Sequence, residues 1–349
     1  MRPQTLLARS LRVAAGTVVL GLAGAPAAAA CGGLVGENGT IQLVRTTTLA
    51  AYHDGVERYV TSFEFTGEGE EVGSIIPLPD IPTTVERGGD WTLQRLAQEV
   101  APRLEEAETT SFDAASAGGA QVILQTQIDA LDITILKGGG DEVGRWALDN
   151  GFLLTPDAPE VLDFYARRSP IFMAARFDAS RAATLGQTSG DGTPIMLTIP
   201  TDDPWVPLRI LGLGLDDDQR VDADVFVLTD EKPRLLAGGP GLTIDRSEPA
   251  SASLLRDLRS DVGMEWVPDE MWLTYLQLGA DAGDLDYDLA VTAEPGRLPA
   301  ISDVGVEASH ARPVTGGGGA GIALWPAVLA VVAGALVLLL RRSPKAVPA

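Results

Sequence analysis

The feature that most constrains this chain is an uninterrupted apolar run near its C-terminus, Gly321–Leu340, which contains no charged residue. Arg341 and Arg342 follow it directly. A helix rises about 1.5 Å per residue, so the run spans roughly 30 Å, the thickness of the hydrocarbon core of a bilayer. We therefore expect a transmembrane helix that contacts the lipid bilayer, in preference to a buried core helix.

The flanks of this run predict its orientation. The tail 341–349 has three basic residues and no acidic one. Short flanks rich in Lys and Arg stay in the cytoplasm. The Gly-rich segment 313–320 before the run is expected to be a flexible linker. The sequence therefore predicts a single-pass cell-membrane protein, with its ectodomain outside the cell and its C-terminus in the cytoplasm.

Residues 1–30 have the pattern of a secretory signal peptide. Three arginines precede an apolar segment, Val13–Gly24, that is too short to span a bilayer, and Ala25–Ala30 offers small-residue cleavage sites. A removed leader and a C-terminal span together predict one ectodomain, displayed on the cell envelope.

The net charge of the predicted ectodomain limits the classes of partner that it can bind. The chain has 26 basic and 48 acidic residues, and the leader and tail hold six of the basic residues and no acidic one. The ectodomain therefore has 20 basic against 48 acidic residues, a net charge of −28. Such a surface repels nucleic acids and anionic headgroups. It favours solubility, and it also suits cationic partners or divalent cations.

Cys31 is the only cysteine, so no disulfide forms within the chain. A secreted domain without disulfides depends on a sizeable apolar core. Cys31 also stands where signal cleavage is expected, which makes it a weak candidate for lipidation. Alanine occupies the position where a bacterial lipobox has a larger aliphatic residue, so we favour an unmodified Cys31 near the first strand.

The ectodomain pattern predicts an α+β, β-rich fold with a central helical hairpin, followed by the one transmembrane helix. Strands come in runs and the helices gather in the middle, which differs from a repeating βαβ order. We divide the ectodomain into 31–245 and a C-terminal part, 246–312, that is either the same domain or a small second one. The expected strands are Gly39–Leu49, Arg58–Thr66, Gly73–Ile76, Gln121–Leu136 (one bent strand or two), Ile171–Asp178, Pro194–Pro200, Trp205–Leu215, Arg220–Leu228, Met271–Leu278 and Leu285–Thr292.

Three of these segments carry specific expectations. A turn at His53-Asp54-Gly55 joins the first two strands into a hairpin. Alternation in Arg58–Thr66 predicts a half-buried strand. Three alternating prolines after Ile76 favour an edge position or an extended crossing.

Capping signals predict the helices. Asp90–Leu104 has an apolar stripe. In the central hairpin, Asp141 is the expected N-cap of a helix that ends at Asn150-Gly151, and the second helix begins at Pro159 near Asp157. Another helix is expected at Ser251–Leu258. We interpret Gly138–Gly140 as a strand-to-helix turn, because two acids follow it and would repel a bound phosphate.

Two acidic clusters are the weak candidates for a metal site, and calcium is the cation that oxygen-rich loops bind. The first lies around a predicted hairpin tip, and the second, which includes Asp281, falls where alternation would place three carboxylates on one strand face. Neither has the spacing of a calcium-binding loop, so we favour a solvated acidic surface. The candidates are Asp216, Asp218, Asp222, Asp224, Asp284, Asp286 and Asp288, with Asp217 inside the first cluster.

Catalytic motifs do not stand out. The chain has two histidines, His53 and His310, whereas hydrolytic triads and zinc sites need well-placed imidazoles. A His53–Asp54 dyad competes with a solvated turn pair, and we favour the turn pair. The tryptophans could line a glycan groove, although core packing explains most of them better. No cofactor is predicted.

Several passages resemble the bacterial secreted family catalogued as domain of unknown function 2330. The resemblance spans about Cys31–Leu213, and the C-terminal span is also similar to that family. It implies an architecture and no activity. It also implies a further cysteine soon after the first, which Leu34–Asn38 does not supply. The matching residues are Cys31-Gly32-Gly33, Ile75-Ile76-Pro77-Leu78-Pro79, Ile135–Gly151, Tyr165 with Ile171–Phe177, and Trp205-Val206-Pro207-Leu208-Arg209.

Three functions follow from these observations. The favoured one is a binding or structural module of the envelope, whose partner would be an envelope protein or a glycan. The alternatives are a carboxylate-dependent envelope hydrolase and a calcium-dependent adhesive module. A pocket with converging carboxylates of perturbed pKa would favour the hydrolase, and an exposed apolar patch or groove would favour the binding module.

Overall fold

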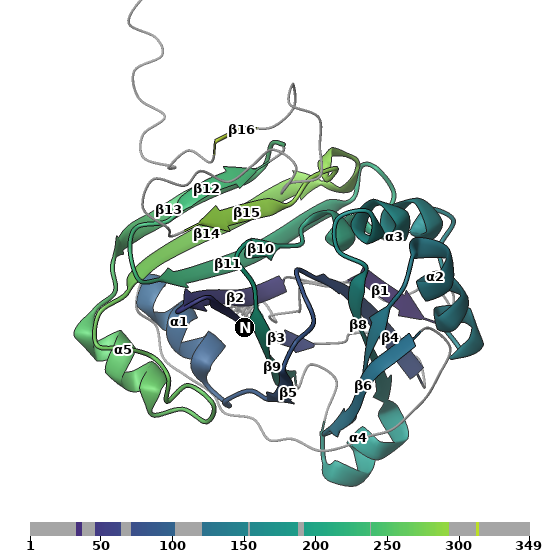
Figure 1. Cartoon of the computed structure of the whole chain (residues 1–349), viewed down its shortest axis with the longest axis horizontal. Coiled ribbons are helices and arrows are strands. Elements are labelled where there is room, and N and C mark those ends of the chain that lie inside the picture. Colours follow the sequence, from purple (N-terminus) through teal and green to yellow (C-terminus); the bar gives the residue numbers. More distant parts are fainter. Residues whose placement is uncertain are drawn as a thin grey trace, which may run out of the picture.

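The computed structural model describes residues 33–36, 46–63, 71–101, 121–152, 154–187, 192–237, 239–292 and 312–313. These ranges form a β-rich α+β fold (Figure 1). The predicted signal peptide, Cys31, the loop 105–119, residues 314–320 of the linker and the apolar run 321–340 lie outside the described residues. Among the helices within the described ranges, none is both long and apolar enough to cross a membrane.

The largest sheet has seven strands, in the order β13-β14-β11-β2-β3-β9-β5. Its neighbours are antiparallel except β2 and β11, which run parallel. The sheet therefore joins the first described hairpin to strands that come more than 150 residues later. Its strands are β2 (Thr46–His53), β3 (Val56–Phe63), β5 (Thr84–Arg87), β9 (Thr193–Pro200), β11 (Arg220–Thr229), β13 (Leu242–Pro249) and β14 (Trp272–Asp281).

Two smaller sheets complete the β structure, a five-stranded one ordered β1-β4-β8-β7-β6 and a four-stranded one ordered β10-β15-β12-β16. The five-stranded sheet contains β1 (Gly33–Gly36), β4 (Glu71–Leu78), β6 (Gln121–Ile128), β7 (Leu131–Lys137) and β8 (Ile171–Asp178). The four-stranded sheet contains β10 (Trp205–Val206), β12 (Arg234–Ala237), β15 (Leu289–Thr292) and β16 (Arg312–Pro313).

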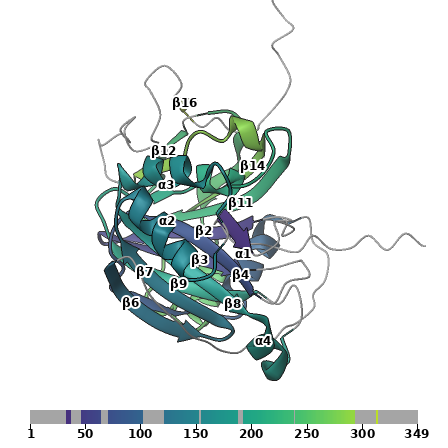
Figure 2. The ribbon, with the colours of Figure 1, turned by 90° about the vertical axis from the view of Figure 1, so that its right-hand side faces the viewer.

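The two larger sheets face each other across the main core, where β7 and β8 side chains such as Ile133 and Met173 meet β9 and β11 side chains such as Leu197 and Val225. Helices cover the outer faces. The helices α1 (Thr92–Val100) and α5 (Ala252–Arg259) pack on the seven-stranded sheet. The helices α2 (Gly140–Asp149) and α3 (Ala158–Ala166) pack on the five-stranded sheet, on the opposite side of the molecule (Figures 1 and 2).

Strand β3 corrects one prediction. Its alternation indicated a half-buried strand, but Val60 is as buried as Tyr59. Tyr59 belongs to the core between the sheets, and Val60 lies in the cluster beneath α1 and α5. Because helices cover the second face, the strand is buried on both sides.

Strand β4 contains Pro77 and is not an outer strand of its sheet, since it lies between β1 and β8. Its pairing with β1 extends only to Ile75, whereas Pro77 pairs with Phe172 of β8. Pro77 therefore stands beyond the end of the β1 pairing, where a missing N–H costs no ladder hydrogen bond on that side. The prediction of an edge position is therefore correct for Pro77 itself, which has a paired strand on one side only, but wrong for β4 as a whole.

The central helical hairpin forms where predicted, with one correction at its start. Gly139, not Asp141, is the N-cap of α2. The Glu142 carboxylate accepts the Gly139 N–H at 2.9 Å, so Asp141 and Glu142 occupy the first turn, where the helix dipole favours acids. Asn150 is the C-cap, and Gly151 adopts a φ of +84°.

Two predicted strands are shorter than expected. Only Trp205–Val206 of the segment 205–215 is a strand, and Arg209–Gly212 forms the 3₁₀ turn η1. Only Leu289–Thr292 of the segment 285–292 is a strand, and it follows the 3₁₀ turn η2 (Ala282–Asp284). The segment Gln121–Leu136 is two strands joined at Asp129-Ala130, and the short helix α4 (Ala179–Leu185) was not predicted.

Candidate functional site

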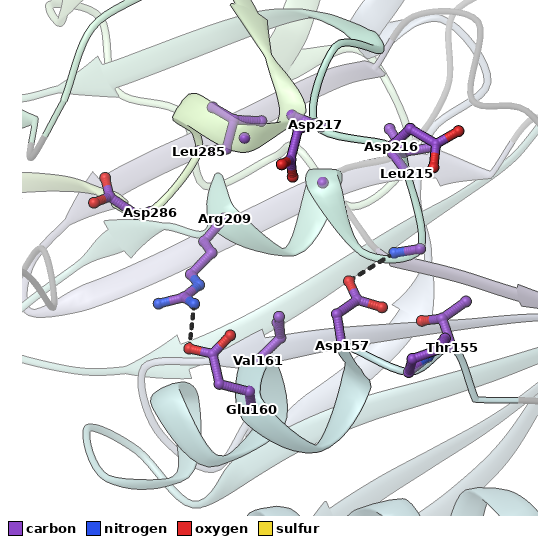
Figure 3. Close-up of a pocket in the computed structure, with 15 residues that line it drawn as sticks. Thr155, Asp157, Glu160, Val161, Arg209, Leu215, Asp216, Asp217, Leu285 and Asp286 are labelled. Carbon is purple, nitrogen blue, oxygen red and sulfur yellow. Dashed lines mark hydrogen bonds and ion pairs between the residues drawn. The ribbon is translucent and has the colours of Figure 1, made fainter.

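A pocket of about 470 Å³ lies where α3, η1, the turn before β11 and η2 meet (Figure 3). It brings together segments from three distant parts of the sequence. Its lining includes one arginine, five carboxylates and a few apolar side chains. These residues are Thr155, Pro156, Asp157, Glu160, Val161, Arg209, Gly212, Gly214, Leu215, Asp216, Asp217, Ala282, Gly283, Leu285 and Asp286.

The N-terminus of α3 fixes one wall. Asp157 is the N-cap residue, but its side chain makes no capping hydrogen bond. Instead, its Oδ2 accepts the N–H of Gly214 at 2.9 Å. Gly214 has a φ of +76°, and an added Cβ would lie 2.6 Å from Thr155 Cγ2. A glycine there lets the chain after η1 turn closely against α3.

Backbone hydrogen bonds join the two acidic segments that form the other wall. Gly283 donates its N–H to the carbonyl of Asp217 at 3.0 Å, and Ala282 donates to the carbonyl of Gln219 at 2.8 Å. The Gln219 side chain closes the turn by accepting the Asp216 N–H at 2.6 Å. The two clusters that the sequence predicts separately therefore meet at one pocket through Asp216, Asp217 and Asp286.

The charge on the lining is unbalanced. Arg209 is the only basic residue of the lining, and its Nη2 lies 2.5 Å from Glu160 Oε1. The same guanidinium stacks 4.3 Å from the centre of the Phe164 ring. Within the described part of the chain, the carboxylates of Asp216, Asp217 and Asp286 accept no hydrogen bond and form no ion pair. Their charges add, so this part of the lining is strongly acidic.

The remaining candidates of the first cluster lie apart from the lining. Asp218 is exposed in the same turn as Asp217. Asp222 lies on β11 and pairs with Arg220, with Nε and Oδ1 3.2 Å apart. Asp224, also on β11, accepts the hydroxyl of Tyr275. The predicted group around Asp216 therefore separates, and only its first members reach the pocket.

The second cluster also separates, and the prediction that Asp284, Asp286 and Asp288 share one strand face is wrong. Asp284 ends η2 and is exposed, whereas Asp288 is fully buried. In the predicted segment 285–292 the strand begins only at Leu289. Asp288, directly before it, turns inward and binds groups of the core instead of continuing an alternating face.

Buried Asp288 belongs to an internal polar cluster with Tyr165 and Arg168. The Tyr165 hydroxyl donates to Asp288 Oδ1 at 2.8 Å, and Arg168 Nη1 lies 2.5 Å from Oδ2. Asp288 Oδ1 also accepts the N–H of Leu208 at 2.7 Å. Burial raises the pKa of Asp288, and the Arg168 charge and these hydrogen bonds oppose that rise. Asp288 therefore holds structure together and is no candidate ligand for a metal.

Sequence reasoning missed Asp157, Glu160 and Arg209 as members of the site. The sequence places Asp157 near the cap of α3, which is correct, but it does not reveal that the Asp157 side chain accepts the N–H of Gly214, 57 residues away. Glu160 and Arg209 are 49 residues apart and pair only because α3 and η1 pack together. No local pattern signals such pairs, whereas the acidic runs themselves were visible in the sequence.

The chain shows weak similarity to solved structures of baculovirus P35. No curated protein matches the chain. The crystal structure of baculovirus P35 gives a TM-score of 0.36 at 10% identity, covering 73% of this chain and 95% of P35. The caspase-8/P35 complex gives 0.32 at 8% identity, covering 71% of this chain and 92% of the other. At these TM-scores the likeness supports neither a shared fold nor a shared function.

The family match covers the first hairpin, the helical hairpin and the part of the pocket that precedes η2. It extends from residue 25 to residue 235, more than half of the chain. Asp157, Arg209 and Asp217 fall inside the match, and Asp286 falls outside it. The chain belongs to the family described as an uncharacterized protein conserved in bacteria, DUF2330.

Proposed function

We propose that this protein is a membrane-anchored, extracytoplasmic binding module of the bacterial envelope, and that its pocket takes a small ligand or side chain bearing an ammonium or guanidinium group. In this proposal residues 1–30 are a leader, 31–312 the displayed binding part and 321–340 the anchor. The family membership supports a bacterial origin, and the sequence pattern of the two ends supports the envelope location.

One observation carries the ligand class. Asp216, Asp217 and Asp286 come from two separate segments and line the same pocket without a cationic partner among the described residues. At an effective dielectric constant of about 20, two charges 4 Å apart interact by roughly 4 kcal/mol. A cation that binds in the pocket is attracted by the charge of these carboxylates, whereas an anionic ligand is repelled.

The size and walls of the pocket favour an organic cation. Its volume of about 470 Å³ suits a small molecule or a long side chain. Val161, Leu215 and Leu285 give it apolar surface that a carbon chain can contact. A calcium ion requires six to eight oxygen ligands at about 2.3–2.6 Å, which would leave most of this volume to water.

The hydrolase alternative lacks a supporting observation. A hydrolase would need a carboxyl group of perturbed pKa in its pocket. The carboxyl groups of the described residues whose pKa is raised are Glu57, Asp132 and Asp288, and none of them lines the pocket. The expected apolar patch is not the site either. In the described part of the chain the large exposed apolar side chains lie on separate elements: Ile123 and Leu124 on β6, Leu148 on α2 and Val262 after α5.

The test is isothermal titration calorimetry of the full-length protein in detergent with agmatine, which carries an ammonium and a guanidinium group. We expect binding that weakens as NaCl is raised. Asp217→Asn and Asp286→Asn should each weaken it by about fivefold or more, since each removes about 1 kcal/mol of attraction or more.

Matched controls lie beside both residues. Asp218→Asn and Asp284→Asn remove exposed carboxylates that do not line the pocket, and they should leave the affinity for agmatine within twofold of the unchanged protein. The proposal fails if agmatine gives no heat, or if the control variants weaken binding as much as the pocket variants. Heat with CaCl₂ but none with agmatine would replace it by the calcium-dependent module.

A further inference from the structure

A second group of potential ligands lies at the tip of the β2–β3 hairpin, away from the residues of the pocket. His53 ends β2, and its Nδ1 lies 2.6 Å from Asp230 Oδ1 while its Nε2 lies 3.4 Å from Asp54 Oδ2. One ligand atom from each of the three residues lies within 4.8 Å of the others. The sequence suggested only the pair His53–Asp54, because Asp230 is 177 residues from His53.

The fold holds the three residues in place by different means. The parallel pairing of β2 with β11 aligns Tyr52 with Thr229, so His53 and Asp230 leave the two strands side by side. Asp54 and Gly55 have φ values of +51° and +74°, as in a tight hairpin turn that Asp-Gly favours. The turn therefore fixes Asp54 beside the imidazole.

Aromatic stacking fixes the orientation of the His53 imidazole. Trp266 stacks on the His53 ring with centroids 6.2 Å apart and an interplanar angle of 28°. The guanidinium of Arg58 covers the Trp266 ring at 4.3 Å. His53 keeps 25% of its side chain exposed, and Asp230 keeps 45%. The ring is thus held in orientation while part of the side chain stays exposed to solvent.

We propose that His53, Asp54 and Asp230 form a binding site for a divalent transition metal ion, with Zn²⁺ as the preferred ion. One imidazole and two carboxylates are a ligand set for zinc, and they would leave at least one coordination position to water. Calcium is excluded as the preferred ion because it selects oxygen ligands. A bound ion would join the hairpin tip to the end of β11.

The ligand atoms need only small movements to reach a bound ion. Zinc–nitrogen and zinc–oxygen bonds are about 2.0–2.2 Å long, so ligand atoms around one ion lie roughly 3–3.5 Å apart. His53 Nδ1 and Asp230 Oδ1 are closer than this, at 2.6 Å, and would separate slightly. Asp54 is 87% exposed and is free to turn its carboxylate toward them.

The experiment is calorimetric titration of the full-length, chelator-treated protein in detergent with ZnCl₂. We expect one ion per chain. Asp54→Asn should weaken binding by about tenfold or more, as the loss of a direct ligand does, while Asn-Gly still supports the same turn. His53→Ala and Asp230→Asn should weaken it further.

The control variant is His310→Ala, which removes the chain's other histidine and should leave zinc binding unchanged. A second readout is the emission of Trp266, because CuCl₂ bound at His53 should quench it, and a Trp266→Phe variant should lose that quenching. The proposal is overturned if the unchanged protein binds no zinc, if Asp54→Asn binds it equally well, or if His310→Ala abolishes binding.

Discussion

At the scale of single residues, Glu57 is a fully buried carboxyl group without a hydrogen-bond partner among the described residues. It is the second residue of β3 and has no exposed surface. Burial raises its pKa from 4.5 to about 8, and the charge of Arg168 opposes that rise only partly. Glu57 is therefore protonated in the folded protein at neutral pH.

This pKa predicts a specific pH dependence of stability. Between pH 4.5 and about 8 the folded chain binds a proton that the unfolded chain releases. The resulting stabilisation is complete below pH 4.5 and is lost as the pH rises toward 8. Urea unfolding of the unchanged protein should therefore show stability falling across this window relative to Glu57→Gln, by roughly 1.4 kcal/mol per pH unit at most.

The control for Glu57→Gln is Glu265→Gln, which changes an exposed carboxylate. Its unfolding free energy should stay parallel to that of the unchanged protein at pH 5, 6.5 and 8. If the Glu57→Gln curve is parallel as well, Glu57 is ionised in the folded protein and the assignment is wrong.

At the scale of elements, the helical hairpin depends on one close backbone approach. A Cβ at Gly140, the first residue of α2, would lie 2.6 Å from the backbone N of Asp163 in α3. Backbone cannot move aside as a side-chain tip can, so Gly140→Ala should destabilise the protein by about 1–3 kcal/mol. Thermal or urea unfolding measures this change.

Gly144→Ala is the matched substitution in the same helix. A Cβ there would make ordinary contacts, 3.4 Å from Leu154 Cδ1 and 3.7 Å from Leu162 Cδ1. It should leave stability unchanged or raise it by up to about 1 kcal/mol, because alanine has the higher helix propensity. Equal destabilisation by both substitutions would contradict a special role for Gly140.

The elements that the sequence predicts well are those set by local signals. Asn150-Gly151 ends α2, Pro159 lies in the first turn of α3, and the Ser251 side chain caps α5 by accepting the Leu254 N–H at 3.1 Å. The expectation of a strand across 205–215 failed because Asp288, 80 residues away, accepts the N–H of Leu208. The local sequence pattern cannot indicate a hydrogen-bond partner that is so distant in the chain.

The sequence likewise predicts only part of the candidate site, namely the acidic residues and not the way they come together. The two acidic runs could be seen in the sequence, yet their meeting depends on a backbone hydrogen bond between Gly283 and Asp217. The alternation of residues in β3 predicts a strand with one exposed face. In the structure both faces are buried, because α1 and α5 cover the outer face. Amino-acid composition and hydrophobic periodicity describe one segment at a time. Packing between segments determines which strand faces are buried and which charged side chains lie close together.

At the scale of the whole molecule, strands that are far apart in the sequence pair within the same sheet. Strand β14, near the end of the described chain, lies between β13 and β11 in the same sheet as β2 and β3. The pocket likewise draws on α3, η1 and η2. The proposed ligand would contact segments that are separated by more than 120 residues. Its binding to the folded protein should therefore raise the temperature of unfolding as well as give heat.

The proposed anchor gives the last prediction. The proposed ectodomain has a net charge of −28, which anionic headgroups repel. In this proposal, segment 321–340 therefore supplies the attachment to the membrane. In bacterial cells the full-length chain should sediment with membranes after a carbonate wash and need detergent for release. A variant ending at residue 320 should appear in the soluble secreted fraction, and as a control a variant lacking only 343–349 should stay with the membranes. If the full-length chain is released by the carbonate wash, or if added protease removes a tag at its C-terminus from intact cells, the proposed topology is wrong.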